Sequence, residues 1–265
     1  MILCADDYGL REDIDRAILE LTLGGRLSAI SCMVVFDRCS RTVLAELLQH
    51  QAHVDIGLHL CLTDEGLPLS PTPQLSGKRL PSFAPLVRQA LSHRMHSAEM
   101  ASHIALQYDL FVEKCGRPPD FMDGHLHVHQ LPGVREELIK FALSLPAAER
   151  PYIRNTNMSL PELRKRRLPW LKAGFLARFG RRMFQQLHAA KLPTNRGFAG
   201  IYNFRQSRRY DQYLPGFLQC LSEENGIMVV HPGTDDLWRR EEFMALRKFT
   251  FPGGLPNRFK REREK

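Results

Sequence analysis

The sequence predicts a single α/β domain with a (β/α) barrel-like fold of the TIM type, irregular or incomplete in places. Apolar, strand-like runs alternate with segments of helical spacing, and chemically active residue types follow the ends of several of these runs. A chain of 265 residues can bury one sizeable core. An open, doubly wound sheet is the runner-up, and the lack of a glycine-rich phosphate loop after any strand argues against nucleotide binding. The barrel is expected to span residues 1–250, followed by a basic, flexible tail at 251–265.

The first half of the chain supplies three strands and two helices to this scheme. A strand is expected within residues 1–9, and a helix follows with apolar residues at helical spacing until Gly24 and Gly25 end it. A β-like run at 29–36 precedes a helical stretch at 43–48. The residues at 53–60 alternate between apolar and polar and predict the third strand.

The second half continues the alternation. Residues 64–87 are rich in Pro, Gly and Ser and predict a long loop over the carboxyl edge of the sheet, where substrate contacts are common. Further elements are expected in the order helix 97–115, strand 122–130, a helix starting near 134, strand 152–154, loop 193–207 and strand 226–230.

The most informative stretch runs from residue 122 to 130, where histidine recurs at every second position. Successive side chains of a β-strand point to opposite faces, so one face would be polar and the other apolar. Imidazole is the commonest protein ligand for a transition metal, and its second nitrogen usually needs a carboxylate or carbonyl partner. The stretch therefore predicts part of a metal-dependent active site, with a His-rich surface strand as the alternative. Its polar face would carry Asp123, His125, His127 and His129.

Two adjacent carboxylates, Asp6 and Asp7, follow the first apolar run and precede a glycine at position 9. A buried strand that delivers acids to a site at its carboxyl edge ends in this way. Adjacent acids on an extended backbone point in different directions, so one can ligate a cation while the other acts as a base. The alternative is that the pair starts a turn or caps the next helix.

Two further strand ends carry histidine. His59 lies at the end of the run at 53–60, and His231 follows the apolar run at 226–230 and precedes a Pro-Gly turn. Four strand ends that deliver Asp, His, His and His favour a shared site over four separate structural roles.

The formal net charge is +8, with basic residues concentrated at 164–196 and in the tail. Such clusters can bind nucleic acid or anionic lipid, but no nucleic-acid motif accompanies them, so no nucleic-acid partner is expected. Apolar residues among the charges at 164–183 resemble a basic amphipathic helix that could rest on a membrane surface. The alternative is a helix that packs its aromatic residues, Trp170, Phe175 and Phe179, onto the barrel.

The six cysteines are scattered without a C-x-x-C pair, which favours small core residues in a reducing compartment. No secretory signal is recognised, and no apolar run approaches the roughly 20 residues that a membrane-spanning helix needs. A cytoplasmic protein is expected, with any membrane contact confined to the periphery of the inner face.

These motifs, in order along residues 1–250, resemble the YdjC-like carbohydrate deacetylases, also called the ChbG/HpnK family. The resemblance rests on Ala-Asp-Asp-Tyr-Gly-Leu at 5–10, Gly-Leu-His-Leu at 57–60, Asp-Gly-His-x-His-x-His at 123–129 and Val-His-Pro-Gly at 230–233. It implies a (β/α) barrel-like fold and metal-dependent removal of N-acetyl groups from amino sugars, in oligosaccharides or lipid-linked glycans.

Carried over to this sequence, the resemblance implies that Asp6 is the catalytic base and His231 the acid on the leaving-group side. It implies that one divalent ion, Mg²⁺ or Zn²⁺, is held by Asp7, His59 and His125. His127 and His129 would lie in the substrate pocket or behind the ligands; Asp123 and Arg154 are candidates for orienting these groups. The expected partner is an N-acetylated amino sugar, and a homo-oligomer is compatible with the sequence. The alternative function is a two-metal hydrolase of phosphoesters or cyclic amides, which the His-x-His-x-His run alone would permit.

Overall fold

A computed structural model of the chain describes residues 1–70, 72, 79–158, 170–204, 209–221, 224–251 and 256–260. Its strands are β1 (Ile2–Tyr8), β2 (Ala29–Cys32), β3 (Asp55–Leu60), β4 (Phe121–Gly124), β5 (Tyr152–Ile153), β6 (Phe198–Ala199) and β7 (Ile227–Val230). Its α-helices are α1 (Glu12–Leu23), α2 (Arg41–Leu48), α3 (Phe83–Leu91), α4 (Ser97–Cys115), α5 (Val134–Ser144), α7 (Trp170–Ala189), α8 (Leu214–Gln219) and α9 (Leu237–Lys248). Short 3-10 turns are η1 (His125–Gln130), η2 (Ala147–Glu149) and η4 (Tyr210–Gln212).

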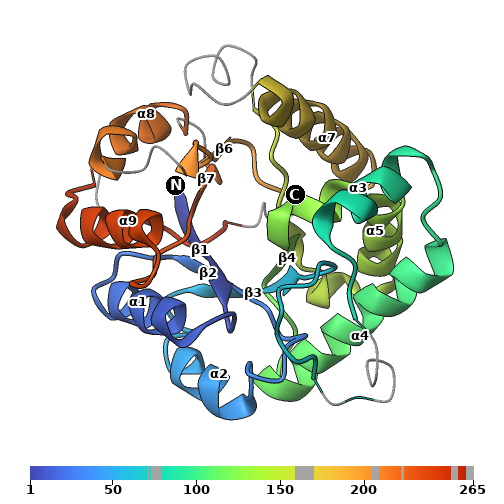
Figure 1. Cartoon of the computed structure of the whole chain (residues 1–265), viewed down its shortest axis with the longest axis horizontal. Coiled ribbons are helices and arrows are strands. Elements are labelled where there is room, and N and C mark those ends of the chain that lie inside the picture. Colours follow the sequence, from blue (N-terminus) through green and yellow to red (C-terminus); the bar gives the residue numbers. More distant parts are fainter. Residues whose placement is uncertain are drawn as a thin grey trace.

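The strands form one seven-stranded sheet in the order β5-β4-β3-β2-β1-β7-β6, and every pairing is parallel. The sheet curls, and the helices surround it on the outside (Figure 1). This confirms the predicted barrel-like α/β fold over the open, doubly wound alternative. Because the strands are parallel, their carboxyl ends lie at one edge, which is where a barrel of this kind builds its site.

Several predicted boundaries were wrong. The second strand ends at Cys32 instead of continuing to residue 36, and α3 begins inside the predicted loop at 64–87. The predicted loop at 193–207 contains the short strand β6, and the predicted strand at 122–130 ends at Gly124. Short strands and turns of this kind carry too few residues for a periodic pattern to show.

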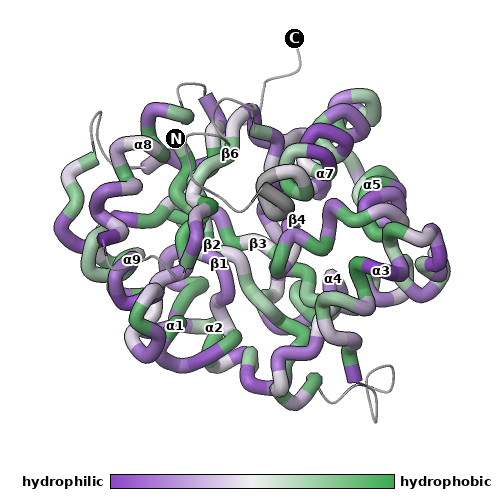
Figure 2. Tube along the Cα trace, turned by 45° about the horizontal axis from the view of Figure 1, so that its top comes forward, coloured by the Kyte–Doolittle hydropathy of each residue, from purple (hydrophilic) through white to green (hydrophobic). Residues whose placement is uncertain are grey.

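Helix α7 packs its apolar face on the barrel. Leu176, Phe179 and Met183 are buried, whereas Arg178 and Arg181 are exposed on the opposite side. The tube in Figure 2 shows the same alternation of apolar and polar residues along this helix. Residues 164–169 and the side chains of 170–173 lie outside the described part of the chain. None of the described helices is both long enough and apolar enough to cross a bilayer.

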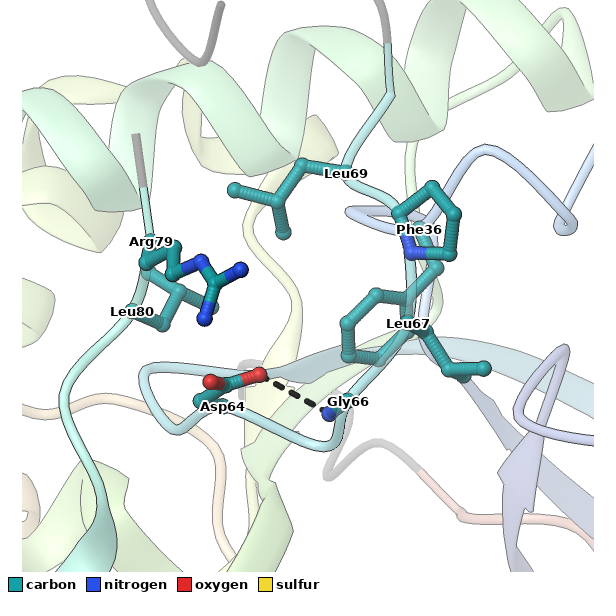
Figure 3. A pocket seen from close by; sticks show the side chains of 8 residues that line it. Phe36, Asp64, Gly66, Leu67, Leu69, Arg79 and Leu80 are labelled. Atoms are coloured by element: carbon teal, nitrogen blue, oxygen red, sulfur yellow. Dashed lines mark hydrogen bonds between the residues drawn. The ribbon is translucent and has the colours of Figure 1, made fainter. Parts of the chain in front are cut away.

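The segment after β3 folds back over the carboxyl edge. Leu69 forms an isolated antiparallel bridge with Phe36, and the amide of Asp37 donates to Pro68 O at 3.0 Å. The amide of Asp64 donates to Pro81 O at 3.0 Å, which closes the segment on itself. These loops enclose a cavity beside the barrel mouth (Figure 3).

Residues 256–260 of the expected tail lie against the opposite end of the barrel. The Arg258 guanidinium pairs with Asp55 at 2.6 Å, and the Phe259 ring stacks on Tyr152 with centroids 4.1 Å apart. The amide of Asn257 donates to Met1 O at 2.8 Å, so this part of the tail is held by the first residue of the barrel.

Two glycines of α7 test how this helix packs. A Cβ at Gly180 would lie 2.5 Å from the carbonyl carbon of Thr156, whereas one at Gly174 would have no neighbour within 4 Å. Gly180→Ala should lower the free energy of unfolding by about 1–3 kcal/mol through overpacking. Gly174→Ala should raise it by roughly 1 kcal/mol through helix propensity. Urea denaturation of both variants measures the two effects; shifts of the same sign would contradict the packing described.

Candidate active site

The two carboxylates at the end of β1 face the interior of the barrel mouth in different directions. The pairing of β1 with β2 is irregular between Ala5 and Tyr8, and Asp7 has a φ of 73°. A positive φ is uncommon outside glycine and is often found at functional sites. The irregular backbone lets two adjacent side chains enter one site, where a regular strand would point them to opposite faces.

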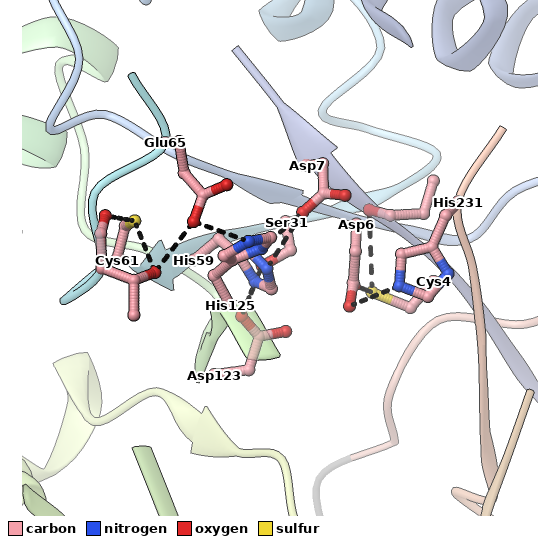
Figure 4. A network of polar contacts seen from close by, with 12 residues as sticks. Cys4, Asp6, Asp7, Ser31, His59, Cys61, Glu65, Asp123, His125 and His231 are labelled. Carbon is pink, nitrogen blue, oxygen red and sulfur yellow. Dashed lines mark hydrogen bonds and ion pairs between the residues drawn. The ribbon is translucent and has the colours of Figure 1, made fainter. Parts of the chain in front are cut away.

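Asp7 forms a compact group with His59 and His125 (Figure 4). Asp7 Oδ1 lies 3.0 Å from His125 Nδ1 and 3.5 Å from His59 Nε2. One ligand atom from each of the three residues lies within 4.8 Å of the others, and all three residues are buried. One carboxylate and two imidazoles are a common ligand set for a catalytic metal that keeps open positions. The predicted metal ligands are therefore brought together.

Each histidine of this group has a carboxylate on its other nitrogen. Asp123 Oδ1 lies 2.6 Å from His59 Nδ1, because the β3–β4 register pairs these two residues directly. Glu65 Oε1 lies 3.3 Å from His125 Nε2. A carboxylate in this position fixes the tautomer and the ring orientation, leaving the inner nitrogen free to bind an ion.

Formal charges also fit a divalent ion. The site holds four carboxylates, those of Asp6, Asp7, Asp123 and Glu65, and two guanidinium groups, those of Arg154 and Arg239. Two negative charges remain, and a divalent cation between neutral imidazoles would balance them.

The same charges shift the pKa values of the two histidines and of Asp7. Burial would lower the pKa of His59, but the carboxylates of Asp123 and Asp6 outweigh it and raise that pKa to about 10. Burial likewise opposes the protonation of His125, yet the charge of Asp7 raises its pKa to about 9. Burial also disfavours the ionised form of Asp7, but Arg239 and His125 hold its pKa well below the usual range. The group therefore attracts positive charge, as protons or as a metal ion.

Arg154 holds the second carboxylate of β1. Its Nη1 and Nη2 donate to Asp6 Oδ1 and Oδ2, both at 2.7 Å, and Nη2 lies 3.1 Å from Asp123 Oδ2. The arginine is fully buried. Cys4, Asp6 and Asp123 could by position form another cation site, but the guanidinium already supplies positive charge there. Arg154 therefore fixes Asp6 and leaves little need for a metal at this point.

Arg239 of α9 performs the corresponding task for Asp7. Its Nη2 donates to Asp7 Oδ2 at 2.6 Å, so the two oxygens of this carboxylate are divided between an arginine and the histidines. The side chain of Arg239 is buried, and its guanidinium lies 4.5 Å from the ring centroid of Trp238.

His231 lies on the side of Asp6 away from the histidine pair, with its Nε2 3.9 Å from Asp6 Oδ2 (Figure 4). Its backbone amide donates to Glu242 Oε2 at 2.6 Å, and Tyr202 donates its hydroxyl proton to Glu242 Oε1 at 2.7 Å. Burial lowers the pKa of His231 to about 4 despite the charge of Asp6. The imidazole is therefore neutral at pH 7, and it would have to gain a proton before it could serve as the acid that the resemblance implies.

The three histidines after Asp123 do not alternate on one face. The backbone leaves the strand at His125 and turns, with positive φ at Leu126 and His127. His129 is buried behind the site, where its Nε2 bonds to Arg154 O at 2.9 Å. Burial lowers the pKa of His129 to about 4, so it is neutral near pH 7.

His127 points elsewhere, with its ring 5.7 Å from that of Phe198 in an edge-to-face arrangement. Of the three histidines in this run, only the first, His125, lies in the group with Asp7 and His59. His129 contributes indirectly by fixing the backbone of Arg154.

Four residues of the site were not anticipated from the sequence: Ser31, Glu65, Arg239 and Glu242. Ser31 donates its hydroxyl proton to Asp123, and it lies in a strand whose other residues are apolar or small. A polar residue inside a buried strand was a usable signal for it. Glu65 lies in a loop, and Arg239 and Glu242 belong to the ordinary amphipathic pattern of α9. No sequence pattern therefore marked any of these three residues as part of the site.

Comparison with known proteins agrees with these features. A family model described as YdjC-like protein matches residues 1–264. A chitooligosaccharide deacetylase of Proteus mirabilis is 31% identical over 142 residues, which are 54% of this chain and 54% of that protein. One of Yersinia enterocolitica is 30% identical over 179 residues, 66% of this chain and 68% of that protein. The chain thus aligns with about half of the Proteus relative and about two thirds of the Yersinia relative.

A solved structure from Enterococcus faecalis, described as a cellobiose-phosphate cleavage protein, has a TM-score of 0.68 to this chain. The two are 15% identical, and the superposition covers 92% of this chain and 89% of that one. At this identity the likeness concerns the fold alone, and it agrees with the barrel-like architecture.

The Glu65–His125 contact predicts a change in metal affinity. Glu65→Ala removes the partner of His125 Nε2, so Zn²⁺ affinity should fall by roughly 10–100-fold. Titration of metal-free protein against a competing chelator measures it. Asp109→Ala, at an exposed position of α4 far along the chain from the loop of Glu65, serves as the control. Equal affinities of the two variants would contradict the role assigned to Glu65.

Glu242 predicts a pH-dependent stability. Burial raises its pKa from 4.5 to about 7, against the hydrogen bonds it accepts. The folded protein therefore holds a proton that the unfolded chain has lost, and this stabilisation disappears as the pH rises from about 4.5 through 7. The difference in free energy of unfolding between the wild type and Glu242→Gln should therefore change in the variant's favour by on the order of 3 kcal/mol between the two ends of that pH window. Urea denaturation at pH 4.5 and pH 8 tests this; a constant difference would refute it.

Proposed function

The chain belongs to the YdjC-like family, and from that premise we propose that it hydrolyses the N-acetyl group of an amino sugar. The observation that carries the proposal is the placement of Asp6 between two groups of different chemistry. The metal-binding residues lie on one side of it, and His231 lies on the other. Relatives described as chitooligosaccharide deacetylases support the amino-sugar substrate.

Asp7, His59 and His125 would hold a divalent ion, which when bound polarises the acetyl carbonyl group and lowers the pKa of a water molecule. The ligand set favours Zn²⁺ or another first-row ion, and a carboxylate with several waters also tolerates Mg²⁺. Arg239 and Asp123 keep the ligands in place, since each binds the outer atom of a ligand side chain.

Asp6 would act as the general base. Both of its oxygens accept hydrogen bonds from Arg154, so the carboxylate cannot rotate, and a water proton would move to a fixed acceptor. Oδ1 also accepts from the Cys4 thiol at 3.6 Å, so the second lone pair of Oδ2 is the one that would take that proton. Rigid placement of a base in this way is worth several orders of magnitude in rate.

His231 would carry the proton onward to the leaving amine. An amine is a poor leaving group unless it is protonated. The 3.9 Å between His231 Nε2 and Asp6 Oδ2 is too long for direct transfer, so one water between them would pass the proton from Asp6 to the imidazole, which then donates it to the amine. This relay replaces the simpler acid role, in which His231 would start out protonated.

The two-metal alternative is less well supported. Among the described residues, the other group that could hold an ion is Cys4, Asp6 and Asp123, and Arg154 makes ion pairs with both of these carboxylates. A lipid-linked amino sugar and contact of residues 164–183 with an anionic membrane stay predictions. The described part of α7 turns Leu176 and Phe179 inward, so its exposed arginines would have to provide that contact. A homo-oligomer also stays a prediction.

Acetate release from N-acetylated sugars tests the proposal directly. Metal-reconstituted protein should release acetate from at least one of N-acetylglucosamine, diacetylchitobiose, sugar nucleotides and lipid-linked amino sugars. Asp6→Asn and His125→Ala should each lower the rate at least about a hundredfold, because they remove the base and a metal ligand.

The exposed residues Asp109 and His188 provide matched controls, and Asp109→Asn and His188→Ala should keep the full rate. Full activity of Asp6→Asn would remove the proposed base. No acetate from any substrate, with metal bound and the fold intact, would shift the weight to the two-metal hydrolase.

A further inference from the structure

One ring nitrogen of His231 lacks a hydrogen-bond partner. The side chain is 13% exposed, and its Nε2 faces Asp6 Oδ2 at 3.9 Å. Its Nδ1, on the other side of the ring, is buried and has no hydrogen-bond partner among the described residues. Buried polar atoms are hydrogen-bonded as a rule, so this nitrogen needs a partner when the site works.

The carboxylate of Glu242 faces this nitrogen. Its Oε1 lies 4.0 Å from His231 Nδ1. This distance is about 1 Å longer than a hydrogen bond, and a small rotation of the imidazole would close the gap. Hydrogen bonds between catalytic groups are often long in a free enzyme and shorten when the substrate binds. Glu242 is therefore the acceptor that a proton on Nδ1 would find.

Two other donors hold this carboxylate in place. Its Oε2 accepts the backbone N–H of His231 at 2.6 Å, and its Oε1 accepts the hydroxyl proton of Tyr202 at 2.7 Å. Glu242 and Tyr202 are both fully buried. A carboxylate oxygen can accept more than one hydrogen bond, so Oε1 keeps a lone pair for Nδ1. The acceptor thus has a fixed position before a substrate binds.

Two aromatic rings restrict the orientation of the imidazole. The ring of Phe204 lies 5.6 Å from that of His231 in an edge-to-face arrangement, and the ring of Trp238 lies 5.9 Å from it. Phe204 and Trp238 also pack on each other, with centroids 4.4 Å apart. Close packing of this kind opposes a half-turn of the imidazole, which would exchange its two nitrogens. Nε2 therefore stays toward Asp6, and Nδ1 stays toward Glu242.

The proton relay sets a requirement on this imidazole. A neutral imidazole carries one proton, and the hydrogen bond at one nitrogen decides where that proton lies. Nε2 can accept a proton that comes from Asp6 only if Nε2 carries none of its own. The proton of the neutral ring must then be on Nδ1, where Glu242 is the acceptor.

We propose that Glu242 is a positioning residue, which holds His231 in the Nδ1–H tautomer and leaves Nε2 free to carry a proton to the leaving amine. A carboxylate behind a catalytic histidine can act in this way. The inference rests on the proposed function for the destination of the proton, because the amine belongs to the amino sugar.

The proton balance of the step is simple. Nε2 gains the proton that Asp6 took from the attacking water, and the imidazole becomes doubly protonated. As the C–N bond breaks, its electron pair stays on the amine nitrogen, which takes the proton from Nε2. The Nδ1 proton remains beside Glu242 throughout, so the ring returns to the same neutral tautomer.

The experiment is ¹⁵N NMR of the histidine rings in the Zn²⁺-loaded protein near pH 8, because ring-nitrogen shifts distinguish the two neutral tautomers. The signals of His231 are those that His231→Ala removes from the spectrum of the 11 histidines. The wild type should show a protonated Nδ1 and a bare Nε2. A proton on Nε2 in the wild type would overturn the inference, whether or not any variant folds.

Glu242→Gln keeps the shape of the side chain and changes one property. The backbone N–H of His231 needs an acceptor, so the amide oxygen of the variant would take the place of Oε2. Its NH₂ group would then face Nδ1 and favour a bare nitrogen there. The proton should move to Nε2, and the two ¹⁵N shifts should exchange. Unchanged shifts in a folded variant would overturn the inference.

A second arm measures acetate release. Glu242→Gln should lower kcat about a hundredfold while KM changes less than twofold, because the tautomer affects proton transfer and not binding. Leu246→Ala truncates a fully buried side chain of the same helix, so it controls for lost stability and should keep kcat within twofold. Equal losses of kcat in the two variants would overturn the inference, since they would indicate a general disturbance of α9.

The two proposals can fail separately, because the NMR measurement needs no substrate. The expected tautomers without acetate release from any substrate would support the position of Glu242 and refute the deacetylase. Acetate release by a wild type that carries its proton on Nε2 would overturn the inference and leave the deacetylase standing. Acetate release by Glu242→Gln at the wild-type kcat would do the same.

Discussion

The site depends on one buried arginine. Arg154 follows β5 directly, and it joins Asp6 at the end of β1 to Asp123 at the end of β4. In the sheet order these two strands are separated by β2 and β3, so backbone hydrogen bonds cannot bring their carboxylates together. The curl of the sheet turns both carboxylates inward, and the guanidinium makes their proximity favourable. Moving such ions out of water costs free energy. Removal of one partner would leave the other charge buried and unpaired, and it would lower the free energy of unfolding by on the order of 3–5 kcal/mol.

The rest of the site extends from this contact in two directions. Through Asp123 the charge of Arg154 reaches His59, and through Asp6 it reaches His231. Asp7 joins this chain of contacts through His59, 3.5 Å away, and takes its own arginine from α9. Two arginines from distant parts of the sequence thus each bind one of the adjacent carboxylates of β1, for which we propose metal binding by Asp7 and proton transfer by Asp6. The positive φ of Asp7 is the local distortion that allows this division.

The loop after β3 contributes to the candidate metal site. Glu65 Oε1 lies 3.3 Å from His125 Nε2, so a residue of this loop holds one of the proposed metal ligands. The loop is itself tied to the barrel, because the amide of Ser70 donates to Val35 O and Lys114 of α4 donates to Ser70 Oγ.

The sequence by itself determined the fold class and the strand ends that carry chemistry, and the resemblance to a known family singled out Asp7, His59 and His125 among them. Alternation of apolar runs and helical spacing is a local property, and the carboxyl ends of parallel strands must meet at one edge, so an acid and several histidines could be expected together. The conformation after Asp123 was not predictable in this way. Three alternating histidines favour a strand, but the backbone turns at His125, and tertiary packing buries His129 behind Arg154.

Only the tertiary structure decided how charge is distributed. Glu65, Arg239 and Glu242 lie in a loop and a helix where their residue types are ordinary, and nothing local separates them from solvated neighbours. Their roles arise from contacts between residues far apart in the chain, such as the 2.6 Å bond between Arg239 and Asp7. The protonation of His231 is likewise a property of its surroundings, because burial outweighs the nearby carboxylates and keeps its pKa low. Periodicity determines which face of an element is buried; the fold determines what that face meets.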